Sequence, residues 1–138
     1  MTLIEVVIVM AIVAILAAIA WPAYQDSVRK GRRSDAMAAL AQVMQAQERF
    51  RSNSAEYAKT LTALNLPSAS PQGYYTTLVV SADAATYEVQ ASVVSGKSQA
   101  QDTQCVTLTA RMNRGQITYA SAASGGAANV TPDPCWIQ

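Results

Sequence analysis

The sequence contains no histidine, and it has only two cysteines among its 138 residues. The absence of histidine excludes catalysis by a histidine base and zinc sites that combine Cys with His ligands. Charged residues make up only 14% of the chain, and ten Lys and Arg against nine Asp and Glu give a net charge of +1. This balance lacks the basic character that favours nucleic acid. With no nucleophile motif, metal-ligand cluster or phosphate-binding loop, we expect no enzymatic activity, metal or cofactor.

Apolar residues are concentrated at the N-terminus. Residues 6–21 are sixteen consecutive apolar positions, and only Thr2 and Glu5 are polar in the first 21 residues. Twenty-one helical residues span about 31 Å, close to the hydrocarbon thickness of a bilayer, about 30 Å. A cleavable secretory signal would have basic residues before the run and a small-residue cleavage site after it. No Lys or Arg precedes this run, so we expect a retained membrane helix over residues 1–24.

Glu5 is the acidic residue within this run. A carboxylate in a membrane helix costs about 2.5–3.5 kcal/mol at the bilayer centre and less near the interface. Glu5 therefore either lies near the helix end and reaches water, or pairs with a cation. The nearest candidate is the α-amino group of Met1, in the same chain or in a neighbouring copy. The dipole at the helix N-terminus also favours an anion here.

Residues 25–138 predict a globular head in the α+β class. Apolar residues recur at helical spacing over 25–52, which predicts an amphipathic continuation of the helix, and a connecting loop follows over 53–73. Pro22 lies between the two helical parts. Because proline removes a backbone donor and clashes with the preceding turn, we expect a kink or a locally unwound stretch at residues 14–22.

Residues 74–120 alternate between apolar and polar side chains, which predicts an antiparallel sheet of four strands in a meander. The strands are expected at 75–81, 87–93, 106–112 and 117–119, with a turn at Asn113–Gly115 that joins the last two. The apolar face of such a sheet needs a cover. The apolar stripe of residues 28–50 is the segment available for it.

The two cysteines lie far apart in the sequence. Cys105 opens the third expected strand, and Cys135 lies close to the C-terminus. In a membrane-anchored chain without histidine, they favour a structural disulfide formed in an oxidising compartment. Such a bond would close the region 105–135 and stabilise the head by about 3–4 kcal/mol in the chain-entropy model. Two free thiols are the alternative.

Basic residues cluster soon after the apolar run, at Arg29, Lys30, Arg32 and Arg33. One interpretation is a solvated face or a set of contacts to lipid headgroups. The other is ion pairs, including salt bridges between subunits, for which the acidic candidates are Asp35, Glu48 and a neighbour's Asp26.

The residues Thr2-Leu3-Ile4-Glu5, the apolar run and Pro22 resemble the mature N-terminus of type IV pilins and related pseudopilins. The family fold is a long N-terminal helix packed on an antiparallel sheet, with a C-terminal region bounded by a disulfide. It matches the expected elements in order and length. The resemblance also matches Cys105 and Cys135 to the cysteine pair that bounds the family's variable region.

The resemblance implies roles in assembly for three N-terminal residues. Glu5 would register each subunit against the N-terminal amine of a neighbour. Met1 would occupy the first mature position, where a prepilin peptidase cleaves and the amine is methylated. Pro22 would mark the place where pilin helices unwind in filaments.

By this resemblance the chain is expected to be a structural subunit, in the first place a type IVa-like major pilin. It would polymerise into an extracellular pilus, or fimbrium, that serves adhesion, twitching motility or DNA uptake. Its partners would be identical subunits, the inner-membrane lipid that holds the single-pass monomer before assembly, and the pilus assembly machinery. The alternatives are a minor pilin that primes or caps the fibre and a type II secretion pseudopilin. A DNA-receptor pilin ranks lower, because Lys97, Arg111 and Arg114 are three scattered cations.

Overall fold

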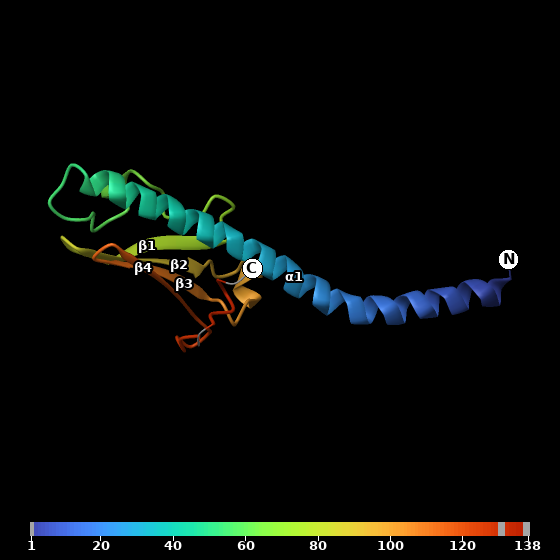
Figure 1. Ribbon diagram of the computed structural model, residues 1–138. Helices are drawn as coiled ribbons and strands as arrows, with labels where there is room; N and C mark the ends of the chain where they lie inside the picture. The colour runs from blue at the N-terminus through green and yellow to red at the C-terminus, as the bar shows by residue number, and fades with distance from the viewer. Residues whose placement is uncertain (1, 130–131, 137–138) are drawn as a thin grey trace. The chain divides into compact units, whose positions relative to one another are not determined.

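The computed structural model describes residues 2–129 and 132–136, so Met1 lies outside the described residues. A long helix is followed by four strands (Figure 1). These elements are α1 (Leu3–Arg51), β1 (Tyr75–Ala82), β2 (Thr86–Val93), β3 (Thr107–Asn113) and β4 (Gln116–Ala122). Two short 3₁₀ turns, Thr62–Leu64 and Ser98–Gln101, lie in the connections. The predicted α+β class is confirmed.

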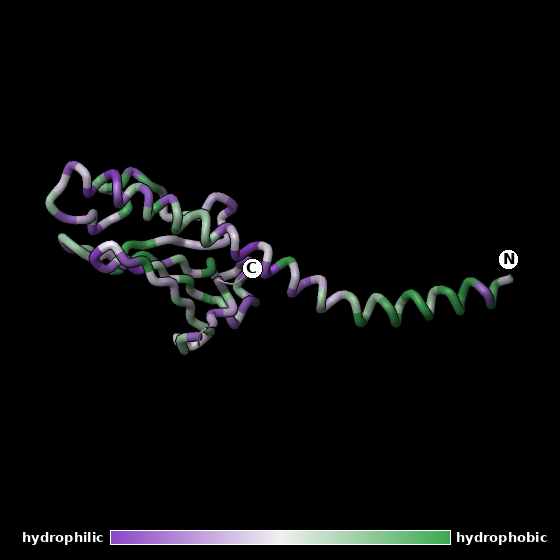
Figure 2. Tube along the Cα trace, in the orientation of Figure 1, coloured by the Kyte–Doolittle hydropathy of each residue, from purple (hydrophilic) through white to green (hydrophobic). Residues whose placement is uncertain are grey.

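Internal contacts divide the chain into two compact units, residues 1–31 and residues 32–138. The first unit is the apolar part of α1, in which every described residue up to position 24 is exposed. Figure 2 shows this part as a nearly continuous hydrophobic stretch. Near its N-terminus, α1 is long and apolar enough to cross a membrane.

Pro22 lies inside α1 without ending it. Residues 14–22 are all helical, although proline lacks the N–H that would bond to the preceding turn. The structure describes a single chain, whereas the unwinding implied by the resemblance belongs to a filament. Unwinding at Pro22 therefore stays a prediction for the assembled state.

The second unit, residues 32–138, is the head. Its sheet is antiparallel with the strand order β1-β2-β3-β4, which confirms the predicted meander. Side chains of β2 alternate as expected, with Val89 and Ala91 on the buried face. The part of α1 within the head covers that face, because Leu40 and Val43 belong to the same buried core. Helix and sheet thus bury one another's apolar sides.

The helical cover does not bury β4. Ile117 pairs with Met112 and Tyr119 pairs with Ala110, so both lie on the face that carries the core. They nevertheless remain 40% and 51% exposed. Trp136, from the C-terminal segment, packs on the Tyr119 ring with 4.5 Å between ring centroids. Its indole N–H donates to the Ala120 carbonyl at 2.8 Å, which anchors the tail to β4.

Candidate functional site

Glu5 belongs to a capping box at the start of α1. Its backbone N–H donates to Thr2 Oγ1, and the Thr2 N–H donates to the Glu5 carboxylate, both at 3.4 Å. This reciprocal pair satisfies two donors at the helix N-terminus. The Thr-x-x-Glu spacing of Thr2 and Glu5 is itself a local signal of a capping box. Pairing of Glu5 with a neighbour's amine stays a prediction.

The basic cluster has different partners from one residue to the next. In the first unit, Arg29 forms an ion pair with Asp26 of its own chain, three residues earlier. Lys30 is exposed. In the head, Arg32 donates to Ser98 Oγ at 2.5 Å, and its guanidinium lies 4.7 Å from the centroid of the Tyr74 ring. The cluster is therefore not one continuous solvated face.

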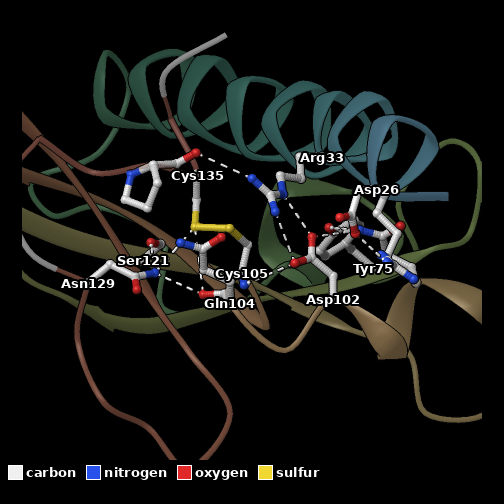
Figure 3. Close-up of polar contacts among 12 residues, drawn as sticks. Asp26, Arg33, Tyr75, Asp102, Gln104, Cys105, Ser121, Asn129 and Cys135 are labelled. Atoms are coloured by element: carbon white, nitrogen blue, oxygen red, sulfur yellow. Dashed lines mark hydrogen bonds and ion pairs between the residues drawn. A yellow bond between two sulfur atoms is a disulfide. The ribbon is translucent and has the colours of Figure 1, made fainter. Parts of the chain in front are cut away.

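Arg33 forms a buried ion pair with Asp102 in the connection between β2 and β3 (Figure 3). Arg33 Nε lies 2.7 Å from Asp102 Oδ2, and Arg33 Nη2 lies 3.0 Å from Oδ1. The two residues are only 7% and 4% exposed. This bidentate geometry matters because an unpaired charge in such a place is costly. Asp102 is not among the acids that the sequence suggests for Arg33, because 69 positions separate the two.

The predicted disulfide between Cys105 and Cys135 is confirmed, and the ion pair lies against it. The Cys105 backbone N–H donates to Asp102 Oδ1 at 3.3 Å. On the other side, Arg33 Nη1 donates to the carbonyl of Pro134, the neighbour of Cys135, also at 3.3 Å. One ion pair thus contacts the backbone next to both half-cystines.

Asn129 contacts the disulfide region as well (Figure 3). Its Nδ2 donates to the Gln104 carbonyl at 2.9 Å and to Ser121 Oγ at 2.6 Å, and it lies 3.3 Å from Cys135 Sγ. Ser121 Oγ in turn donates to Asp133 Oδ1 at 2.7 Å, which also accepts the Cys135 N–H at 2.9 Å. Polar contacts therefore fix the C-terminal segment on β4.

The acids suggested for intersubunit salt bridges make contacts within the head. Asp35 is 2% exposed and accepts hydrogen bonds from Ser70 Oγ at 2.5 Å, Gln72 N at 2.9 Å and Tyr74 N at 3.3 Å. These donors hold the loop before β1 on the helix. Glu48 is exposed and accepts from the Tyr57 hydroxyl at 3.4 Å. Asp35 thus needs no second subunit to satisfy its carboxylate, and bridges between subunits stay a prediction.

The three cations suggested for DNA do not gather in one place. Arg111 lies on β3 and Arg114 in the turn to β4, whereas Lys97 lies in the connection that enters β3 from the other end. The length of β3, about 20 Å, separates the two groups. Arg111 is paired with Glu88 at 2.5 Å. Within the residues that the structure describes, the exposed side chains of Lys97 and Arg114 have neither a hydrogen-bond nor an ion-pair partner.

The turn that carries Arg114 lines a shallow depression. It has a volume of about 730 Å³ and lies between the β1–β2 turn and the β3–β4 turn. Arg114 has a φ of 49°, and its backbone N–H donates to the Ala85 carbonyl at 3.0 Å, which joins the two turns. Backbone N–H groups of Ala85 and Thr86 bond to the Asp83 carboxylate and lower its pKa. The depression therefore combines an exposed cation with two turns that a backbone hydrogen bond joins.

The chain matches the model of a known protein family. A family model described as "Type IV minor pilin ComP, DNA uptake sequence receptor" matches residues 22–109, more than half of the chain. No curated protein matches the chain. The matched residues include the Arg33–Asp102 pair, Arg32 and Lys97, and they end within β3, before Arg111 and Arg114.

Proposed function

This chain belongs to the type IV minor pilin family of DNA uptake sequence receptors, and we propose that it is a minor pilin that binds DNA. The observation that carries the proposal is the match of that family's model over residues 22–109. It reverses the order that the sequence favours, in which a major pilin ranks first and a DNA receptor ranks low. Pilins are structural proteins with a pilus or membrane-associated location, and the apolar start of α1 is consistent with that.

Exposed cations on the head support contacts to phosphate. Phosphate neutralisation by Lys and Arg supplies most of the sequence-independent affinity for DNA. Lys97 and Arg114 have no ion-pair partner among the described residues, so neither has to give up an internal contact to bind a phosphate. A duplex carries one charge per roughly 1.7 Å of its axis. Over the length of β3, about 20 Å, a duplex presents many phosphates, so one duplex segment is long enough to contact Lys97 and Arg114 together.

Two amide side chains near Arg114 would contact bases. Asn113 and Gln116 are exposed, and they pair across the β3–β4 hairpin on either side of the turn. Asn and Gln recognise adenine through paired hydrogen bonds to its edge. We place base recognition at this hairpin and phosphate contacts at both ends of β3.

The assembly role of the first unit is part of the same proposal. The apolar part of α1 would hold the monomer in inner-membrane lipid and then pack among the helices of other pilins. Glu5 would meet a neighbour's N-terminal amine, with Met1 supplying its own amine to the next subunit. Such a contact is selective, because an unpaired carboxylate is costly in an apolar setting.

Deletion of this subunit tests the proposal in cells. We expect long fibres to persist by negative-stain microscopy while DNA uptake is lost. In the deletion strain, the Lys97→Ala/Arg114→Ala double variant should be produced like the wild-type subunit but should not restore DNA uptake. The control variant Arg49→Ala, which removes an exposed cation from α1, should be produced and should restore DNA uptake. Loss of fibres on deletion would indicate a major pilin. Normal uptake without the subunit would contradict the proposal.

A further inference from the structure

We propose that the Arg33–Asp102 ion pair positions the two cysteines for disulfide formation, so that docking of the C-terminal segment on α1 and oxidation of the thiols favour each other. Arg33 and Asp102 act here as positioning residues, because they touch the backbone beside the sulfurs and not the sulfurs themselves. This inference concerns the head alone and does not depend on DNA binding.

The ion pair lies where three separate segments meet. Arg33 comes from α1, Asp102 and Cys105 come from the connection before β3, and Cys135 comes from the C-terminal segment. Asp102 holds the Cys105 backbone, and Arg33 holds the carbonyl beside Cys135 (Figure 3). Each charge therefore fixes one of the two residues that must meet, and the bidentate contact fixes the charges to each other.

Trp136, Asp133 and Asn129 hold the C-terminal segment on β4, whereas Arg33 joins it to α1 and to Asp102. The cysteines are 30 residues apart, and the described segment 132–136 contains neither a helix nor a strand. Before oxidation, that segment depends on polar contacts such as those of Arg33, Asp133 and Asn129. A buried guanidinium whose carboxylate is lost would draw in water or turn outward. The Pro134 contact would then be lost, and the two thiols would meet less often, although Trp136 still holds the segment on β4.

The coupling must act in both directions. If the ion pair raises the effective concentration of one thiol near the other, then the closed disulfide stabilises the ion pair by the same factor. Oxidation by glutathione disulfide illustrates the step. One protein thiolate attacks a glutathione sulfur and releases a glutathione thiolate, and the second protein thiolate then displaces the remaining glutathione. Two electrons pass to glutathione disulfide, and the two thiol protons end on two reduced glutathiones.

The test is a redox titration of the full chain in detergent micelles. The protein is equilibrated with mixtures of reduced glutathione and glutathione disulfide, free thiols are trapped with a maleimide, and the oxidised fraction is read by mass. The equilibrium constant gives the effective concentration of the two thiols. We expect Arg33→Met to lower it by about tenfold, a typical size for coupling between linked sites. Arg33→Lys keeps the charge but loses the bidentate geometry, and it should fall between Arg33→Met and the wild type.

Two matched variants separate positioning from a general loss of stability. Arg111→Met removes the exposed ion pair with Glu88 and should leave the effective concentration unchanged. Gln47→Ala removes a buried side chain of the same helix that bonds Ala58 rather than the disulfide region, so it should lower the stability of the head without changing the redox equilibrium. In concentrated urea, all variants should converge with the wild type.

The proposal is overturned if folded Arg33→Met keeps the wild-type effective concentration, or if Gln47→Ala lowers that concentration as much as Arg33→Met does. Circular dichroism shows whether Arg33→Met is folded. If it is not, Asp102→Asn decides, because it keeps the shape of the side chain and removes its charge. An unchanged redox equilibrium in folded Asp102→Asn would contradict the proposal as firmly.

Discussion

Gln47 and Ala58 bond to each other twice, through the side chain of one and the backbone of the other. Gln47 Nε2 donates to the Ala58 carbonyl, and the Ala58 N–H donates to Gln47 Oε1, each at 2.8 Å. Both residues are buried. The side-chain amide of Gln47 thus bonds both backbone groups of Ala58, as a paired strand would, and it holds the loop after α1 against the helix. This contact allows a long connection to satisfy its backbone inside the core.

Gln47→Ala should destabilise the head by about 2–4 kcal/mol, because it leaves a buried N–H and a buried carbonyl without partners. The measurement is the free energy of unfolding in urea. Gln42→Ala, at an exposed position of α1, is the control and should change little. Equal free energies of unfolding for the two variants would contradict this prediction and would indicate that water bonds the Ala58 N–H and carbonyl in place of the Gln47 amide.

Much of the head could be predicted from the sequence, because the local patterns agree with the final structure. Alternation along 87–93 identified β2, helical spacing identified the part of α1 that covers the sheet, and the two cysteines pair as expected. The partners of Arg33 and Asp35 could not be predicted from the sequence, because they lie 69 and 35 or more positions away along the chain. No local periodicity reports contacts of that kind. The capping box of Thr2 and Glu5 is a local pattern, and the sequence alone could have predicted it.

Alkaline pH should destabilise the head through buried tyrosine. Burial is the main cause that raises the pKa of Tyr75 to about 12, against a hydrogen bond from Gln99 that lowers it. Because the folded pKa lies above the unfolded value of about 10, the contribution to stability is complete below pH of about 10 and is lost as the pH rises through about 12. Tyr75→Phe should make the fall in unfolding free energy shallower over that range. A fall as steep as in the wild type would rule out Tyr75 as a source.

Glu5→Ala should leave the monomer folded in the membrane but prevent its incorporation into pili, because the neighbour's terminal amine loses its partner. Glu5→Gln separates charge from capping, since the amide can still accept the Thr2 N–H bond. We expect Glu5→Gln to fail in assembly as well. The measurement is the amount of subunit in sheared fibres relative to the membrane fraction. Normal incorporation of either variant would contradict the proposal that the charge of Glu5 aligns each subunit with its neighbour.

The central claim, that the head binds DNA through phosphate contacts at both ends of β3, is tested most directly by fluorescence anisotropy of labelled duplex with the full chain in detergent, over a series of salt concentrations. The logarithm of the binding constant should fall linearly with the logarithm of salt concentration. Lys97→Ala and Arg114→Ala should each reduce that slope by about 1, and Arg49→Ala should leave it unchanged. Binding that does not depend on salt, or the same slope in all four proteins, would contradict the claim.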